Sequence, residues 1–130
     1  DAPQLPYHFS DQITGANAAR VNARLIVEGA NGPTTLEADA ILADRGIPVV
    51  PDILANAGGV TVSYFEWVQD LGRLFWDRDE IRFKLAEMMS DAFDRVWSVA
   101  DEKSLTLRPA AMVAAIREVA AALESRGIYP

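Results

Sequence analysis

The chain has 130 residues, half of them apolar and 24% charged, which is ordinary for a soluble globular protein with room for one hydrophobic core. Its formal net charge of −7 leaves no excess of Lys and Arg to neutralise phosphates, which disfavours nucleic acids and anionic membrane surfaces as partners. The absence of cysteine excludes disulfides and thiol chemistry, and without a signal-like or membrane-length apolar segment the sequence predicts a cytoplasmic protein.

Residues 1–11 contain two prolines and show no helical period, so they predict an irregular or extended segment. The single histidine, His8, lies there without a group to orient it, and one His with no Cys predicts no metal site. We expect a short helix within residues 12–22, capped by Thr14. The first residue is Asp1 rather than Met, which indicates a processed start or a piece of a longer protein.

Two apolar runs flank a well-marked helix in the next part of the chain. Residues 23–28 and 47–50 predict strands, and the unbroken apolar run of the first indicates burial on both faces, as in a parallel sheet. Thr34 and Glu37 form a capping box at the start of the intervening helix, and Gly46 ends it. Its packed face consists of Ala38, Ile41 and Leu42. Strand, helix and strand at this spacing predict a right-handed βαβ crossover.

The C-terminal half reads as helical. After a helix over residues 59–70, Asp77 and Glu80 cap a long amphipathic helix that runs to about Lys103. Its apolar stripe comprises Ile81, Leu85, Met88, Met89, Ala92, Phe93, Val96 and Ala100. We assign the following aromatic and sulfur-containing side chains to the core: Tyr64, Phe65, Trp67, Met88, Met89 and Trp97.

A last helix is expected over residues 108–126, with Thr106 as its cap and Gly127 at its end. Its inward face would comprise Ala111, Ala115, Ile116, Val119 and Leu123. A short loop joins this helix to the preceding one, so the two are expected to lie antiparallel and to cover one another.

Polar residues and glycines follow both predicted strands at the point where each leads into a helix. Asn31 follows the first strand, and Asn56 with Gly58 and Gly59 follows the second. In open α/β sheets ligands bind at the carboxyl ends of strands, so these loops predict one binding crevice. Two plainer interpretations stay open: Asn31 belongs to an Asn-Gly-Pro turn, and the paired glycines only permit tight packing.

Ser63 lies about one turn into the helix that follows these glycines, and its hydroxyl can donate to a carboxylate. Most helical serines instead face solvent or bond a neighbouring carbonyl.

These segments resemble the glutamate dehydrogenase family, which also includes leucine, phenylalanine and valine dehydrogenases. The likeness runs from about Gln12 to the C-terminus and is densest over residues 27–35 (Val-Glu-Gly-Ala-Asn-Gly-Pro-Thr-Thr) and 56–67. It implies an α/β fold: the second half of a Rossmann-like doubly wound parallel sheet, then two long antiparallel helices, helix-rich as a whole. Residues 1–72 would form a partial NAD(P)-binding domain and residues 73–130 a helical segment packing on it.

The resemblance also implies functional residues. The cofactor-binding positions would be Gly29, Ala30, Asn31, Asn56 and Gly58. The serine matching Ser63 contacts the side-chain carboxylate of glutamate in the family, whereas relatives that act on leucine, valine or phenylalanine lack a hydroxyl there. Ser63 therefore argues for an acidic substrate.

Several parts of the family's machinery have no counterpart in this sequence. It contains no G-x-G-x-x-G loop for the pyrophosphate and no acidic residue for the cofactor ribose. The family's catalytic Lys and Asp lie upstream, and Lys84 and Lys103 match neither that lysine nor the lysines that grip the substrate. The chain also reads Pro6-Tyr7-His8 where members usually read Pro-Ala-Ala.

We therefore expect the C-terminal fragment of a glutamate dehydrogenase, inactive alone, with no catalytic residue of its own. The parent reaction would be NAD- or NADP-dependent reversible oxidative deamination of L-glutamate to 2-oxoglutarate and ammonia. Its partners would be the rest of the enzyme or identical chains in a homo-oligomer. Two alternatives remain: a non-catalytic interaction module, because half a sheet leaves strand edges unpaired, or a small nucleotide-binding module.

Overall fold

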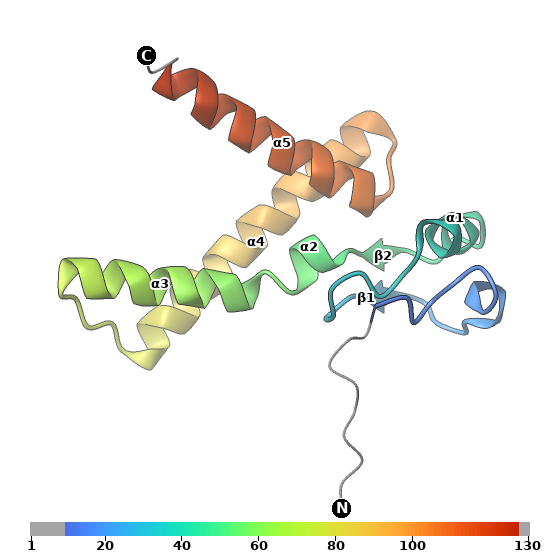
Figure 1. The fold of residues 1–130 in the computed structure, drawn as a ribbon, viewed down its shortest axis with the longest axis horizontal. Coiled ribbons are helices and arrows are strands. Elements are labelled where there is room, and N and C mark those ends of the chain that lie inside the picture. Colours follow the sequence, from blue (N-terminus) through green and yellow to red (C-terminus); the bar gives the residue numbers. More distant parts are fainter. Residues whose placement is uncertain (1–9, 128–130) are drawn as a thin grey trace, which may run out of the picture. The chain divides into compact units, whose positions relative to one another are not determined.

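The computed structural model describes residues 10–127, which are mostly helical with two short parallel strands (Figure 1). The chain divides into two compact units, one ending at Ala57 and the other starting at Gly58. Most helices and strands of each unit correspond to segments that the sequence predicts.

The first unit contains a parallel strand–helix–strand motif. Its elements are β1 (Ile26–Val27), α1 (Leu36–Asp44) and β2 (Val49–Val50). Ile26 pairs with Val49, and Val27 with Val50, so the predicted parallel pairing is confirmed.

Both strands are shorter than predicted. Pro48 has no N–H, so it accepts a hydrogen bond from Ile26 (3.0 Å) but cannot donate one, and β2 starts only after it. At the carboxyl end of the two strands, the N–H of Glu28 donates a hydrogen bond to the carbonyl of Val50 (3.1 Å).

The core of this unit forms on one side of the strand pair. Its buried members come from four segments: Ala18, Ala38, Leu42, Ile47 and Val49. Ile26 packs against this cluster, whereas Leu25 and Val27 are exposed because successive strand residues point to opposite faces. The expected burial of β1 on both faces is therefore wrong for the described structure.

The ends of α1 follow the predicted signals with one shift. Thr35, not Thr34, is the N-cap, and its Oγ1 accepts the N–H of Ala38 at 3.2 Å. Gly46 lies after the helix with φ +69°, a left-handed conformation that glycine adopts without strain, as predicted.

The helix expected over residues 12–22 is mostly absent. Only a 3₁₀ turn, η1 (Ala18–Arg20), forms there. The side chain of Asn17 accepts the N–H of Thr14 (2.8 Å) and donates to the carbonyl of Gln12 (2.8 Å). These bonds satisfy groups that a helix would otherwise use, so Thr14 is not a helix cap. The expectation for residues 1–9 lies outside the described residues.

A short helix that the sequence analysis missed, α2 (Asp52–Ala55), follows β2 directly. It occupies the loop between β2 and the paired glycines, and Asn56 ends it.

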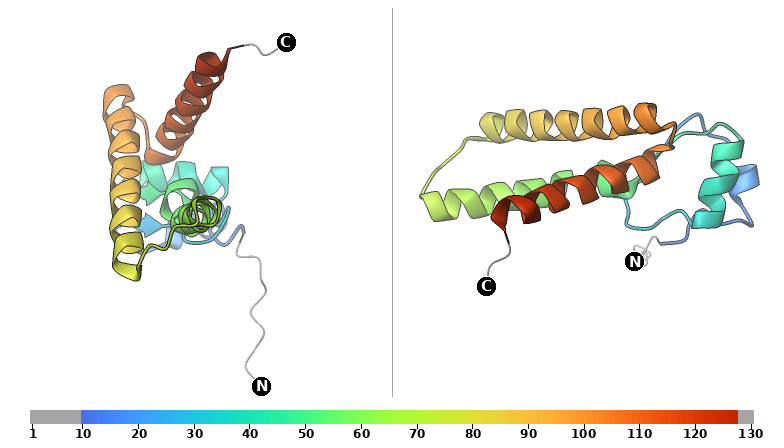
Figure 2. Two further views of the ribbon diagram at one scale, coloured as in Figure 1. Left: turned by 90° about the vertical axis from the view of Figure 1, so that its left-hand side faces the viewer. Right: turned by 90° about the horizontal axis from the view of Figure 1, so that it is seen from above.

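The described residues of the second unit, 58–127, form three helices (Figure 2). These are α3 (Gly58–Gly72), α4 (Arg78–Lys103) and α5 (Leu107–Arg126). All three predicted helices are confirmed, with boundaries within one or two residues of the predicted ones.

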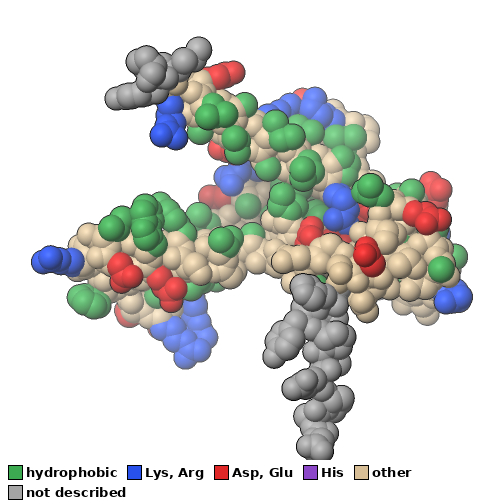
Figure 3. Space-filling model, in the orientation of Figure 1, with side chains coloured by type: hydrophobic (Ala, Val, Ile, Leu, Met, Phe, Trp, Pro, Cys, Tyr) green, Lys and Arg blue, Asp and Glu red, His purple; other side chains and the backbone are tan. Residues whose placement is uncertain are grey.

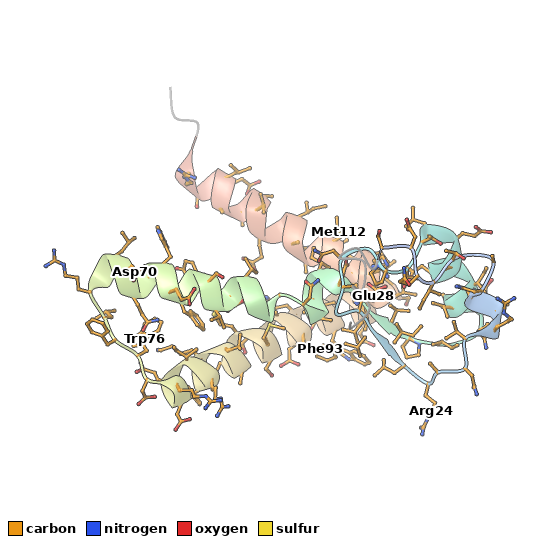
Figure 4. The ribbon with its side chains drawn as sticks, turned by 60° about the horizontal axis from the view of Figure 1, so that its bottom comes forward. Arg24, Glu28, Asp70, Trp76, Phe93 and Met112 are labelled. Carbon is orange, nitrogen blue, oxygen red and sulfur yellow. The ribbon has the colours of Figure 1, made fainter. Side chains whose placement is uncertain are left out.

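Trp76 lies in the loop between α3 and α4 and contacts residues of both helices (Figure 4). Its ring meets that of Phe65 edge-on at 5.8 Å between centroids, and the ammonium of Lys84 lies 4.8 Å from its ring centre. The backbone N–H of Trp76 donates to the Oε1 of Gln69 at 2.7 Å. These contacts fix the path by which the chain turns from α3 into α4.

Replacing Asp77 with alanine is expected to lower the free energy of unfolding by about 1 kcal/mol, because its Oδ1 accepts the N–H groups of Asp79 (2.9 Å) and Glu80 (2.8 Å). The matched control is Asp79→Ala. That side chain is 92% exposed and its ion pair with Arg82 is long, at 3.9 Å, so we expect less than half the loss of unfolding free energy. Urea unfolding followed by circular dichroism measures both. Equal losses would show that charge at the helix start, rather than capping, is the cause.

The last two helices cover one another less than expected. Ala110 and Ala111 at the start of α5 are buried, but the later residues assigned inward are exposed: Ala115, Ile116, Val119 and Leu123. Figures 1 and 2 show α5 diverging from α4 beyond their connection. Small alanine side chains allow the close approach at the start of α5, and the bulky residues follow where the helices have separated.

The core assignment of the aromatic side chains is only partly correct. Phe65 is buried, and Met89 is partly buried, as expected. Four others are exposed: Tyr64, Trp67, Met88 and Trp97. Figure 3 shows hydrophobic side chains gathered along the surfaces of α3 and α5. Apolar residues on one helix face need a covering element, and the described residues of this unit do not supply one for these side chains.

Candidate functional site

Two loops leave the carboxyl ends of the parallel strands in the first unit. One spans residues 28–35 after β1, and the other spans residues 51–57 after β2. Since the strands are parallel and paired in register, both loops emerge at the same edge of the sheet. This is the edge at which open α/β sheets bind ligands.

The side chains of Asn31 and Asn56 meet at this edge. The Nδ2 of Asn56 donates to the Oδ1 of Asn31 at 2.6 Å, across 25 positions of sequence. The predicted convergence of the two loops is therefore confirmed for these amides. After this bond, the pair still presents the amide hydrogens of Asn31 and the carbonyl oxygen of Asn56 as hydrogen-bonding groups.

Two carboxylates also join the same two loops. Glu28 is only 2% exposed, and its Oε2 accepts the N–H of Asp52 at 2.8 Å. The Oδ2 of Asp52 in turn accepts the N–H of Gly32 at 2.8 Å, which ties the start of α2 to the turn after β1. Figure 4 shows Glu28 in the region where these loops come together.

Gly32 needs its lack of a side chain because its φ is +57°. Its carbonyl accepts the N–H of Asp11 (2.9 Å), and that of Pro33 accepts the N–H of Ile13 (2.9 Å). A bridge between Ile13 and Thr34 extends this contact. The turn role of the Asn-Gly-Pro segment is thus real, and it leaves the amide of Asn31 at the sheet edge.

The glycines predicted to admit a cofactor have open space beside them. A Cβ placed on Gly29 would meet nothing within 4 Å, and the same holds for Gly59. A Cβ on Gly58 would make only an ordinary contact with Leu85 at 3.9 Å. Packing within each unit therefore does not require glycine at these three positions. Ala30 lies partly buried beside Gly29 in the first loop.

Ser63 belongs to the second unit, in the second turn of α3, and is exposed. The structure places it one turn beyond Gly59 on the same helix. Its proposed contact with a substrate carboxylate stays a prediction.

Sequence reasoning missed Asp52 and the role of Glu28. A signal was present, because each is an acidic residue at the end of an apolar strand, directly after Val27 and Pro51. A carboxylate there can accept the loop N–H groups that the sheet no longer pairs. Within residues 10–127 the structure holds no group of three or more His, Asp or Glu side chains arranged to bind a metal ion. No helix among those residues is long and apolar enough to cross a membrane.

Residues 4–127 match the model of the Glutamate/Leucine/Phenylalanine/Valine dehydrogenase family. The chain is 56% identical over 126 residues to the glutamate dehydrogenase of Thermotoga maritima, covering 97% of this chain and 30% of that protein. It is 46% identical over 125 residues to the NAD-specific glutamate dehydrogenase of Clostridioides difficile, covering 96% of this chain and 30% of that enzyme. It is 47% identical over 123 residues to the NADP-specific glutamate dehydrogenase of Synechocystis, covering 95% of this chain and 29% of that enzyme.

Solved structures give the same result. The glutamate dehydrogenase of Peptoniphilus asaccharolyticus superimposes with a TM-score of 0.87 at 46% identity, over 92% of this chain and 30% of that one. The hetero-hexameric glutamate dehydrogenase of Thermus thermophilus, in a leucine-bound form, superimposes with a TM-score of 0.87 at 37% identity. The match covers 93% of this chain and 29% of that one. The chain thus spans about 30% of the length of the curated relatives it matches.

Proposed function

Because the chain belongs to the glutamate/leucine/phenylalanine/valine dehydrogenase family, we propose that it is the C-terminal part of an NAD- or NADP-dependent glutamate dehydrogenase. The parent enzyme reversibly deaminates L-glutamate to 2-oxoglutarate and ammonia. In this proposal residues 1–72 complete a doubly wound nucleotide-binding sheet, and residues 73–130 form the helical segment that packs on it. The remaining strands, the pyrophosphate loop and the catalytic Lys and Asp come from the rest of the enzyme.

The contact between Asn31 and Asn56 is the single observation that carries this proposal. A nicotinamide carboxamide presents one acceptor oxygen and two donor hydrogens. The paired amides offer the complementary set, hydrogens on Asn31 and an oxygen on Asn56, at the sheet edge where dinucleotides bind. By family resemblance, the asparagine that matches Asn56 lies beside the nicotinamide end of the cofactor, and this complementarity agrees with the nicotinamide half as the ligand of the pair.

The open space at Gly29 supports the same assignment, because a ligand can approach the backbone closely there, and Gly58 is included on family resemblance. We include Ala30 among the cofactor-binding positions on family resemblance. Ser63 is proposed to bind the side-chain carboxylate of the substrate, which makes glutamate rather than an apolar amino acid the substrate. Relatives include both NAD- and NADP-specific enzymes, so the proposal covers either cofactor.

A hybrid enzyme tests the proposal. The matching segment of the Thermotoga maritima enzyme is replaced by this chain, which is 56% identical to it over 126 residues. We expect the hybrid to reduce NAD or NADP in the presence of glutamate, and the 130-residue chain alone to show no turnover, because it lacks the pyrophosphate loop. Spectrophotometry of the reduced nicotinamide measures both. A folded, oligomeric hybrid without activity would contradict the proposal, and so would turnover by the chain alone.

A second candidate is a non-catalytic module that binds identical chains or the rest of an enzyme. The exposed large apolar residues of α5, which include Ile116, Val119 and Leu123, favour it. Light scattering of the 130-residue chain tests the second candidate. A strictly monomeric, stably folded chain would count against the module, whereas stable self-association would favour it.

A further inference from the structure

Asp52 is the residue at which the hydrogen bonds of both loops meet. Its N–H donates to the buried carboxylate of Glu28, and its own carboxylate accepts the N–H of Gly32, each at 2.8 Å. Its carbonyl accepts the N–H of Asn56 at 3.0 Å. The side chain of Asp52 therefore holds the neighbour of Asn31, while its backbone holds Asn56 itself.

These bonds form a closed ring with the amide pair. The carboxylate of Asp52 accepts from Gly32, which is covalently joined to Asn31. A hydrogen bond of 2.6 Å between the side-chain amides then leads to Asn56, whose N–H donates back to the carbonyl of Asp52. Removing one bond of the ring relaxes the spacing that the remaining bonds maintain between the two amides. The bond between Gly32 and Asp52, at 2.8 Å, is one of the restraints of this ring, and it needs an accepting oxygen on the side chain of residue 52.

Glu28 fixes the other side of Asp52. It is anchored in the sheet, since its N–H donates to the carbonyl of Val50 at 3.1 Å. Its buried carboxylate then sets where α2 begins, because it accepts the first N–H of that helix. The position of Asp52 is thus set by β1 rather than by the loop alone.

We propose that Asp52 is a positioning residue, which holds the side chains of Asn31 and Asn56 at the spacing needed to bind the nicotinamide carboxamide. This inference rests on the proposed function, in which the two amides bind the cofactor. In this proposal Asp52 acts on cofactor binding through the paired amides.

The test is a double-mutant cycle in the hybrid enzyme. Asp52→Ala is expected to raise KM for the dinucleotide about tenfold while kcat changes little, because the amide pair loses its spacing. In the Asn31→Ala/Asn56→Ala background, the same change is expected to raise KM less than about twofold, since no pair remains to position. Asp52→Asn, which keeps an oxygen that can accept from Gly32, is expected to restore most of the affinity.

The matched control is Asp44→Ala, which removes an exposed carboxylate at the end of α1 and is expected to leave KM unchanged. Hydrogen exchange by mass spectrometry on peptides spanning residues 29–33 gives a readout that does not depend on activity. Faster exchange at Gly32 in the Asp52→Ala hybrid is expected.

The outcomes separate the two claims. If the Asn variants raise KM but Asp52→Ala has the same effect in both backgrounds, or none, positioning by Asp52 is overturned and the proposed function stands. If the Asn variants leave KM unchanged, the proposed function fails. Hydrogen exchange at Gly32 then decides for Asp52: faster exchange supports the loop-holding role, and unchanged exchange overturns it.

Discussion

Replacing Asn56 with alanine in the hybrid enzyme is expected to lower kcat/KM for the dinucleotide by about 30- to 100-fold. The change removes an acceptor for the nicotinamide carboxamide and also the donor that holds the Oδ1 of Asn31 at 2.6 Å. The two hydrogen bonds lost, one to the carboxamide and one between the side-chain amides, contribute about 0.5–1.5 kcal/mol each, and a total of about 2–3 kcal/mol corresponds to this factor. Steady-state kinetics with saturating glutamate and varied NAD or NADP measures it.

The matched control for this prediction is Asn22→Ala, an exposed amide outside the two loops. We expect its kinetics to stay within about twofold of the parent hybrid, as is usual for surface substitutions. Equal losses in the two variants would show that the effect of Asn56→Ala comes from general destabilisation and would remove the support for amide recognition of the cofactor.

Replacing Ser63 with alanine is expected to lower kcat/KM for glutamate by about 10- to 100-fold, because a hydrogen bond to a charged group contributes about 1.5–3 kcal/mol. The straight-chain analogue 2-aminopentanoate lacks the side-chain carboxylate, so its kcat/KM is expected to change little. The ratio of the two values, measured on the same preparations, reports substrate preference independently of enzyme stability.

Ser98→Ala provides the comparison for Ser63. The hydroxyl of Ser98 donates to the carbonyl of Asp94 at 2.8 Å, the ordinary role of a helical serine. Loss of Ser98 is expected to leave the glutamate preference unchanged. If Ser63→Ala also leaves the preference for glutamate over 2-aminopentanoate unchanged, Ser63 has the same ordinary role as Ser98. The proposal that Ser63 selects glutamate would then be wrong.

Signals carried by neighbouring residues predicted local structure well. The cap at Asp77 and the stop at Gly46 act within one turn of backbone, so four or five residues determine them. The convergence of Asn31 and Asn56 was also predictable, because parallel strands bring the ends of both loops to one edge.

Errors arose where side chains compete with the backbone or where burial depends on distant segments. Asn17 forms two side-chain bonds that replace most of a helix, and no periodic pattern reveals that competition. Trp67 and Trp97 lie on apolar helix faces, which predicted burial, yet both are exposed. Periodicity shows which residues share a face, but it does not show whether another element covers that face.

By itself, the sequence determined the order and type of most elements, the ends of the helices and the family to which the chain belongs. Only the tertiary structure decided that Glu28 and Asp52 join the two loops and that Asn31 bonds Asn56 rather than pointing away from it. The physical reason is that caps and turns use bonds between residues a few positions apart. The site instead depends on hydrogen bonds that join residues 20–25 positions apart, and these exist only after the strands have paired.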